Sequence, residues 1–380
     1  MKHILLRSSA LAAVFVCLGS AQATTYYNYV DLGANFYPLG ISPTAGYIVG
    51  DSGAVNGTQM VYMKINTANG VTVMPITPVP TSNGVISNIG FANSINDGGT
   101  LLGQDQMHII GYSYTINSSG PTRLLPDPHP QGTYPPNGIF PAAITNGGNT
   151  CGFDNDQIPL GCNCWFKNWN YGFPPTPAGT FAGFGAVNDS GLCSAFYGSY
   201  TWNAGTNTWT QVAASSPAPS SSGVGTLYLT SSLLGCPYCG MNSYGVNMGT
   251  TVNGSGTPIP FRNTSASQLA NPYNSGGTVY GAVAYGINNA GFIVGTLTPG
   301  TSGMPHAFIA WNNTGTDLNG LVNSLPANTT LEYATAIDNT TVAGQVTGCI
   351  IGVSAVVTGT GRLKTTTYHG FVLIPTAVLP

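Results

Sequence analysis

Short runs of alternating apolar and polar residues fill this chain, and turns rich in Gly, Asn, Ser and Thr separate them. Clear examples are Tyr112–Thr115, Tyr200–Trp202 and Ala307–Trp311. A period of two, punctuated by turn residues, is typical of short β-strands. Beyond the first 23 residues no stretch has a 3.6-residue period, so we expect almost no helix there. The pattern predicts an all-β protein.

One phrase recurs seven times along the chain. It consists of an apolar residue, an Asn or a substitute, two turn residues, a Gly, and an apolar stretch that ends in a small residue. The copies run from Ile41 to Gly50, Ile95 to Gly103, Ile144 to Gly152, Val187 to Ala195, Met241 to Gly249, Ile287 to Gly295 and Ile337 to Gly344. Successive copies begin 54, 49, 43, 54, 46 and 50 residues apart. This near-even spacing indicates a repeat architecture.

Each copy of the phrase predicts a tight hairpin. The side-chain amides of Asn96, Asn188, Asn242 and Asn288 can cap the turn, and the Gly three residues later can adopt a positive φ. The residue that closes the phrase is usually Gly, which permits a bulge or the close approach of another backbone. A third strand follows each hairpin, and in the clearest repeat a fourth strand ends near Asp317. Four short strands in each repeat are typical of a propeller blade.

The two ends of the chain complement each other. Tyr26–Gly33 has the pattern of the fourth strand of a blade, whereas His369–Ile374 has the pattern of a third strand with no fourth strand after it. Neither a solenoid nor two β-sandwiches would predict this complementarity. We therefore expect residues 24–380 to form one domain, a seven-bladed β-propeller of four-stranded blades. Pairing of the N-terminal strand with the C-terminal blade would close it and remove the open sheet edges.

One repeat carries a family resemblance. The residues from Ala282 to Leu318 contain AYGINNAGFIVGTL, then HAFIAW from His306, then GTDL. This combination resembles the HAF-repeat family of bacterial extracellular proteins, which is named for its His-Ala-Phe triplet. His369 begins a degenerate copy of the triplet, HGF, at the matching position of the last repeat. The resemblance implies a repeat fold and an extracellular location, and it implies no particular activity or substrate.

The first 23 residues have the three parts of a secretory signal peptide. Lys2 and Arg7 form a basic region, an apolar segment to Gly19 follows, and Ala21–Ala23 is an A-x-A cleavage site. The apolar segment is shorter than the roughly 20 residues that span a membrane. We expect a secreted protein, extracellular or at the cell surface, with the periplasm as a further option and with no membrane insertion.

The low charge of the chain narrows its partners. Charged residues make up 5% of the sequence, the net charge is −3, and three Lys and three Arg lie beyond the signal peptide. A nucleic-acid partner requires a cluster of cations that neutralise phosphates, so nucleic-acid binding is not expected. An anionic membrane surface is disfavoured for the same reason. With 10% aromatic residues, the chain also lacks the composition of a disordered protein.

Cysteines suggest local disulfides. Cys17 leaves with the signal peptide, and in an oxidising compartment most of the remaining seven cysteines should pair, with one left over. The motif CPYC from Cys236 to Cys239 copies a glutaredoxin active site, but it precedes a β-hairpin rather than a helix, which favours a local disulfide. Cys162 and Cys164 form the second candidate pair. A zinc site made from these four thiols is disfavoured by oxidative export.

Three aspartates are the best catalytic candidates. Asp51, Asp105 and Asp154 each follow a repeat hairpin by one or two residues, and equivalent positions in a ring converge near its axis. Paired carboxylates about 5–10 Å apart hydrolyse glycosidic bonds, although turn capping explains these residues more simply. His306 and His369 share a repeat position, which indicates a structural role such as a hydrogen bond to a neighbouring blade. The chain has no hydrolase, zinc-protease or phosphate-loop motif, and we expect no cofactor and no metal.

The leading hypothesis is a non-enzymatic extracellular module that binds an unidentified glycan or protein, or mediates surface interaction. Aromatic and amide side chains suit such contacts through stacking and hydrogen bonds. The candidate tryptophans are Trp165, Trp169, Trp202, Trp209 and Trp311. One alternative is a propeller glycoside hydrolase or polysaccharide lyase that uses the axial Asp residues. Another is a structural matrix component, in which low charge would permit dense assembly.

Overall fold

The computed structural model describes the chain as a series of segments. These cover residues 26–34, 36–52, 59–66, 72–73, 77–78, 90–105, 111–118, 122–123, 139–154, 163–166, 170–172, 184–195, 198–203, 205–206, 208–214, 239–252, 258–262, 281–298, 304–311, 314–360 and 363–379. β-strands dominate these segments, and the helical part of them is a 3₁₀ turn, η2 (Leu318–Gly320). The all-β prediction is confirmed. The part of the chain that the structure describes contains no helix long and apolar enough to cross a membrane.

Strands that follow one another in the sequence pair antiparallel, so each repeat forms its own sheet. Sheet I contains β2 (Tyr37–Ile41), β3 (Tyr47–Asp51), β4 (Met60–Asn66), β5 (Thr72–Val73) and β6 (Thr77–Pro78). Sheet II contains β7 (Gly90–Ile95), β8 (Thr100–Asp105), β9 (Gly111–Thr115) and β10 (Thr122–Arg123). Sheet III contains β11 (Ile139–Ile144), β12 (Thr150–Asp154), β13 (Asn163–Phe166) and β14 (Asn170–Gly172).

The second half of the chain continues this pattern. Sheet IV contains β15 (Phe184–Val187), β16 (Cys193–Ala195), β17 (Gly198–Asn203) and β18 (Thr208–Ala214). Sheet V contains β19 (Cys239–Met241), β20 (Asn247–Val252) and β21 (Pro258–Arg262). Sheet VI contains β22 (Gly281–Ile287), β23 (Ile293–Thr298), β24 (His306–Trp311) and β25 (Thr314–Asp317). Sheet VII contains β27 (Thr329–Ile337), β30 (Ile350–Thr358), β31 (Thr365–Pro375), β1 (Tyr27–Ala34) and β26 (Val322–Asn323).

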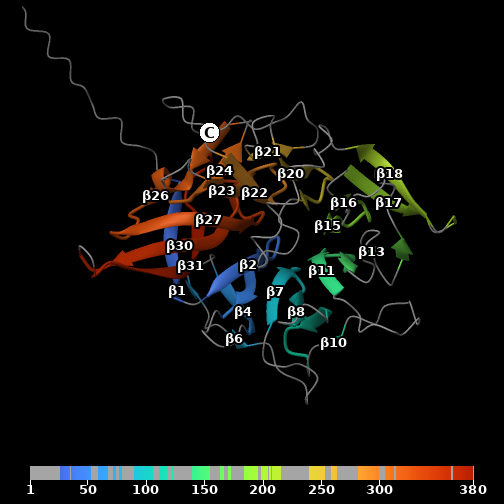
Figure 1. Ribbon diagram of the computed structural model, residues 1–380, viewed down its shortest axis with the longest axis horizontal. Helices are drawn as coiled ribbons and strands as arrows, with labels where there is room; N and C mark the ends of the chain where they lie inside the picture. Colours follow the sequence, from blue (N-terminus) through green and yellow to red (C-terminus); the bar gives the residue numbers. More distant parts are fainter. Residues whose placement is uncertain are drawn as a thin grey trace, which may run out of the picture.

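The sheets are arranged around a common centre in chain order, as Figure 1 shows. The first strand of each sheet packs against the first strand of the next. β2 packs against β7, β7 against β11, β11 against β15, β15 against β19, β19 against β22, and β22 against β27. β27 in turn packs against β2, so the last sheet lies beside the first. This arrangement of the sheets is propeller-like.

Sheet VII combines the two ends of the described chain. β1 runs antiparallel to β31, from Tyr27 opposite Pro375 to Ala34 opposite His369. Its other edge pairs in parallel with β26, where Tyr27 lies opposite Val322. The N-terminal strand therefore stands beside the third strand of the last sheet, in the position that β25 takes beside β24 in sheet VI.

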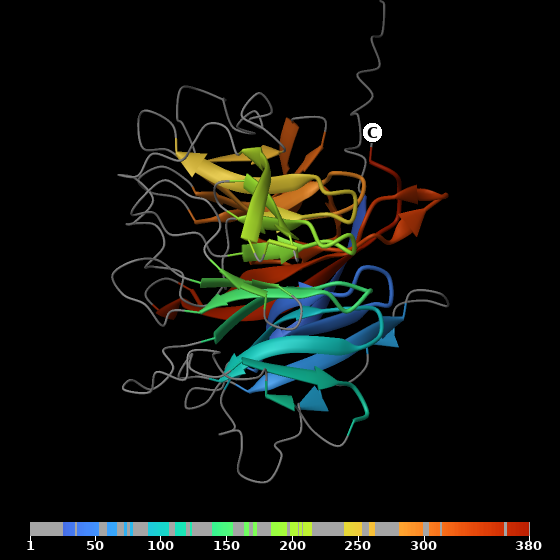
Figure 2. The ribbon, with the colours of Figure 1, turned by 90° about the vertical axis from the view of Figure 1, so that its right-hand side faces the viewer.

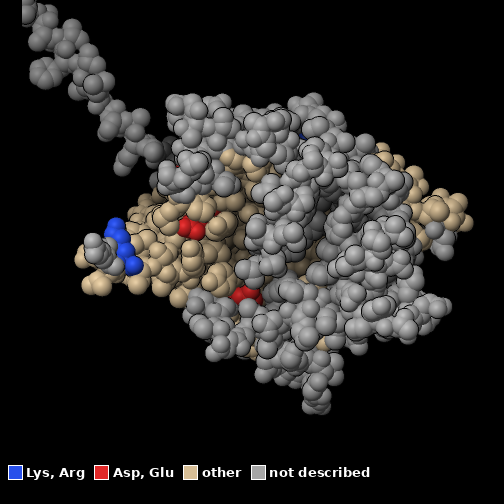
Figure 3. Space-filling view, viewed as in Figure 1, with Lys and Arg blue, Asp and Glu red and all other residues tan. Residues whose placement is uncertain are grey.

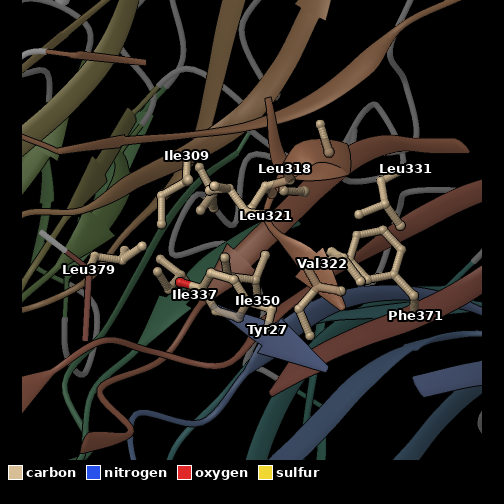
Figure 4. Packing of buried hydrophobic residues seen from close by; sticks show 14 residues of the cluster. Tyr27, Ile309, Leu318, Leu321, Val322, Leu331, Ile337, Ile350, Phe371 and Leu379 are labelled. Atoms are coloured by element: carbon tan, nitrogen blue, oxygen red, sulfur yellow. The ribbon is translucent and has the colours of Figure 1, made fainter. Parts of the chain in front are cut away.

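The hydrophobic core lies between neighbouring sheets. One cluster joins sheets VI and VII through Ile309, Leu331 and Phe371, and Figure 4 shows these side chains together with Tyr27. Further clusters join sheets VII and I, I and II, III and IV, and V and VI. Apolar side chains thus point from one sheet into the next, because a short sheet has no other partner against which to bury them.

The hairpins of the repeated phrase gather on one side of the molecule, which we call the turn face (right in Figure 2). The opposite side, at which the first strand of each sheet begins, is called the start face. Adjacent turns are joined by hydrogen bonds. The Nδ2 atom of Asn96 donates to the carbonyl of Thr145 at 3.1 Å, and Asn242 donates to Asn288 at 3.0 Å. The repeated Asn therefore caps its own turn and also links two sheets.

Close backbone contact explains the Gly that closes most copies of the phrase. A Cβ at Gly50, Gly295 or Gly352 would overlap a main-chain carbonyl of the first strand, in each case that of the residue before the one paired with the Gly and next to a β-bulge. The prediction for the last copy was wrong at this point, because its closing residue is Gly352 and not Gly344. An inserted hairpin of β28 (Thr341–Val342) and β29 (Gln345–Val346) separates its two strands.

Candidate functional site

Three tyrosines lie where sheet VII meets sheet I on the start face. Tyr37 and Tyr333 occupy equivalent positions in the first strands of their sheets. Each directly precedes the residue that pairs with the closing Gly of its repeated phrase. The hydroxyl of Thr335 donates to the carbonyl of Pro38 at 2.8 Å, which holds the two first strands together. Tyr368 of β31 is 44% exposed. It lies near both other phenols, since it contributes to the raised pKa of each.

Two carboxyl groups accompany these tyrosines. Asp51 lies opposite Tyr37 in the ladder of β2 and β3, and Glu332 precedes Tyr333 at a bulge of β27. Both residues are 3% exposed. Burial raises the pKa of Tyr37, and the neighbouring Asp51 raises it further. Burial also raises the pKa of Tyr333, and Glu332 adds to that rise. The phenols are therefore neutral donors that stand beside acceptors.

A histidine adjoins this group from sheet VI. The Nδ1 atom of His306 lies 2.7 Å from Oδ2 of Asp317. Asp317 also accepts hydrogen bonds from the backbone N–H and the side-chain amide of Asn319, at 2.9 and 2.8 Å. Burial raises the pKa of Glu332, and His306 in its protonated form would oppose that rise, so these two side chains are close enough to interact. The predicted link of the histidines to a neighbouring blade was wrong, because His306 and His369 bond within their own sheets.

Two of the described cations are distant from this site. Lys64 lies over the ring of Tyr47, 4.4 Å from its centroid, and Arg262 donates to the carbonyl of Gly291 at 3.2 Å. Both contacts are on the turn face. Lys364 lies in the hairpin between β30 and β31. Figure 3 shows how few charged atoms the described part of the start face carries. The described groups thus give the site an acidic and aromatic character.

The three predicted aspartates are not equivalent in register. Asp51 is one residue beyond its closing Gly, whereas Asp105 and Asp154 are two residues beyond theirs. Neighbouring positions of a strand face opposite sides of the sheet, so these positions do not share one side. The side chains of Asp105 and Asp154 lie outside the described residues. Asp51 is the candidate that the structure places beside the tyrosines.

The described tryptophans belong to the packing of the sheets. Trp209 is 6% exposed and lies edge-on to Trp202, with ring centroids 5.1 Å apart. Trp311 packs against the core between sheets VI and VII. Trp169 and the side chain of Trp165 lie outside the described residues. The described tryptophans therefore contribute to the packing of the sheets.

The candidate disulfides fall outside the described side chains. Cys162 and Cys236 are not described, and Cys164 and Cys239 are described as strand positions alone. Cys349 is a free, buried thiol. Burial raises its pKa, and the nearby Asp338 adds to that effect. Among the described residues no three His, Cys, Asp or Glu side chains gather as a metal site would require.

Sequence reasoning missed the tyrosines and Glu332. One signal for the tyrosines was present, because Tyr37, Phe91, Phe140 and Tyr333 each stand four residues before the first residue of a repeated phrase. An aromatic position that recurs in several repeats indicates a ring of aromatic residues on one face. Glu332 had no such signal, since it occupies a bulge that other repeats do not share.

Comparisons with known proteins give little further detail. No protein-family model and no curated protein matches the chain. YCF48 bound to a D1 peptide is similar over 94% of this chain and 98% of its own, with 11% identity and a TM-score of 0.44. A subtype N11 neuraminidase-like protein of a flat-faced bat isolate from Peru has coverages of 94% and 96%, 11% identity and a TM-score of 0.38. An Aleuria aurantia lectin in complex with alpha-methyl-L-fucoside is similar over 90% of this chain and 96% of its own, with 10% identity and a TM-score of 0.28. Likenesses at this level indicate no ligand and no activity.

Proposed function

We propose that this chain is an exported glycan-binding protein, non-enzymatic, whose site lies on the start face between sheets VII and I. The observation that carries the proposal is the group of Tyr37, Tyr333 and Tyr368 beside the carboxyls of Asp51 and Glu332. Tyrosine rings offer flat apolar faces on which a pyranose ring can stack, and each ring ends in a hydroxyl. Buried carboxyls beside them can accept hydrogen bonds from sugar hydroxyls.

We infer further that the seven sheets are the blades of one closed propeller. Contacts between the last and the first sheet support this. Thr335 donates to the carbonyl of Pro38 at 2.8 Å, and the amide of Asn339 donates to the carbonyl of Pro43 at 2.7 Å. A closed ring would fix Tyr37 against Tyr333, although nearly 300 residues separate them in the chain. Export through residues 1–23, and membership of the HAF-repeat proteins through the triplet at His306, belong to the same proposal.

A glycan-array screen of the exported protein tests this function, followed by titration of each hit with tyrosine variants. We expect Tyr333→Ala and Tyr368→Ala each to weaken binding about tenfold or more, which is the effect of losing one stacking contact. Tyr244 supplies the matched control, because it is 76% exposed on the turn face. Tyr244→Ala should bind as the unaltered protein does.

Two results would overturn the proposal. One is that the Tyr333 and Tyr368 variants bind every hit with unchanged affinity. The other is that mass spectrometry finds the bound glycan cleaved, and that Asp51→Asn abolishes the cleavage. The second result would assign the site to a glycoside hydrolase or lyase instead.

A further inference from the structure

Glu332 is the least satisfied acidic group of this site. It is 3% exposed and is the single Glu of the sequence. Its main-chain carbonyl accepts a hydrogen bond of 2.8 Å from Thr296 of sheet VI, which fixes the backbone at this point. Among the described residues no group donates a hydrogen bond to its carboxyl. A carboxyl that receives no hydrogen bond from the protein has its acceptor sites free for a bound partner that donates.

The neighbouring histidine adds a second acceptor. His306 directs Nδ1 at Asp317, and Asn319 fixes Asp317 while bonding both backbone groups of Leu331. Leu331 directly precedes Glu332, so one hydrogen-bonded unit sets the positions of the imidazole and the carboxyl. When Nδ1 carries the proton that it donates to Asp317, Nε2 presents a lone pair. The His306 side chain is 42% exposed, so a ligand can reach it.

The molecule contains an equivalent pair without these features. His369 lies 2.9 Å from Asp31 in the matching position of sheet VII. There Nε2 of His369 lies 3.3 Å from the hydroxyl of Thr367, within hydrogen-bonding distance. The His369 pair is therefore complete as it stands, whereas the pair of His306 faces an unsatisfied acid.

We propose that the glycan bound at the start face carries protonated amines, and that it is a polymer or oligomer of 2-amino-2-deoxyhexose. This inference rests on the glycan-binding function proposed above. An ammonium group would donate to the Glu332 carboxyl and to Nε2 of His306, while the attached ring stacks on Tyr333. Lys64 and Arg262 do not compete for this place, since both lie on the turn face. An acidic sugar would meet Glu332 and Asp51 and be repelled.

Calorimetric titration of the whole protein with two hexasaccharides of one backbone tests the inference. One is the glucosamine hexamer and the other is its fully N-acetylated form, which has the same rings without the charge. We expect the free amine to bind about tenfold more tightly, as a charge-assisted hydrogen bond provides. Glu332→Gln should remove this preference and leave affinity for the acetylated hexamer within about twofold. Asp31→Asn, which alters the equivalent pair, should keep the preference.

The outcomes separate the two proposals. Equal binding of both hexamers by the unaltered protein would overturn the amine inference and leave glycan binding intact. Tighter binding of the acetylated form would do the same. If no glycan of any class binds, both proposals fail together. The comparison of the two ligands on the unaltered protein decides the question even if Glu332→Gln does not fold.

Discussion

The Nδ2 atom of Asn288 donates a hydrogen bond of 3.2 Å to the main-chain carbonyl of Asp338, its counterpart one repeat later. Its Oδ1 atom accepts from the amides of Ala290 and Phe292, at 3.1 and 3.0 Å. One side chain therefore closes its own turn and holds the turn of the next sheet. A carboxylate or a hydroxyl offers less, because only an amide combines two acceptor sites with two donors. This double task explains why Asn recurs in the repeated phrase.

Replacing Asn288 should destabilise the protein well beyond an ordinary turn mutation. Asn288 is 2% exposed, so Asn288→Ala leaves one carbonyl and two amides without their partner in a buried place. We expect the free energy of unfolding to fall by about 2–4 kcal/mol, measured by urea denaturation. Asn203→Ala is the control. Asn203 is exposed and caps one turn of sheet IV, so its loss should cost less than about 1 kcal/mol. Equal losses would contradict the linking role.

Asp338 occupies the repeat position that Asn288 occupies in the preceding repeat, but it carries a carboxyl group in place of the amide. We expect the protein to be more stable when this position carries an amide. Burial raises the pKa of Asp338 to about 6, even though Thr340 and Cys349 donate to it. The folded chain thus holds this proton more tightly than the unfolded chain. The stability that the group contributes is complete below its unfolded pKa, near 3.8, and is lost as the pH rises through about 6.

Asp338→Asn should therefore raise the free energy of unfolding by about 1–3 kcal/mol at neutral pH, and by little near pH 4. Thermal unfolding of the unaltered protein and of Asp338→Asn across this pH range measures the difference in their stability. The other titrating groups are the same in both proteins, so their effects cancel in this difference. A difference that does not change with pH would show that the carboxyl is not held in its neutral form.

The repeat, its strands and its turns were predictable because each depends on neighbours close in the sequence. An alternation of residues gives a strand, and Asn followed by Gly gives a turn with a positive φ, as at Gly99 and Gly291. The last hairpin was misjudged for the same reason. Its inserted turn at Ala343 and Gly344 imitates the repeated phrase locally, and the sheet contacts that place Gly352 opposite Ala334 are not visible in the sequence.

The site was less predictable, because residues from both ends of the chain build it. Asp51 was found through its place after a hairpin, but its neighbours Tyr333 and Tyr368 come from the last repeat. Their proximity depends on the contact between β2 and the strands of sheet VII. A position shared by all repeats can be read from a pattern, whereas a position used once, such as Glu332, can be recognised only after folding.

Tyr27→Phe should leave stability unchanged or raise it by about 1 kcal/mol. Tyr27 is fully buried among Val322, Ile337 and Ile350, as Figure 4 shows, and among the described residues its hydroxyl has no hydrogen-bond partner. Removing that hydroxyl ends the cost of its burial and keeps the ring. Urea denaturation measures the change.

The contrast with Tyr29 makes the Tyr27 result informative. Tyr29 belongs to the same strand, and its hydroxyl lies 3.2 Å from Oγ of Ser354, so Tyr29→Phe should lose about 0.5–1.5 kcal/mol. If Tyr27→Phe costs as much as Tyr29→Phe, then the Tyr27 hydroxyl has a partner that the described residues do not include.

Cys349 should be a protected thiol that takes no part in a disulfide. It is fully buried, its Sγ lies 3.5 Å from the hydroxyl of Thr340, and burial raises its pKa, so the reactive thiolate is scarce. Thiol titration with a chromogenic disulfide reagent, without reductant, checks this. Native protein and Cys349→Ala should give the same count, whereas in denaturant the variant should give one thiol fewer. One thiol more in the denatured variant than in the denatured unaltered protein would place Cys349 in a disulfide, because its partner would then be free. A higher native count for the unaltered protein would show that Cys349 becomes accessible in the folded state.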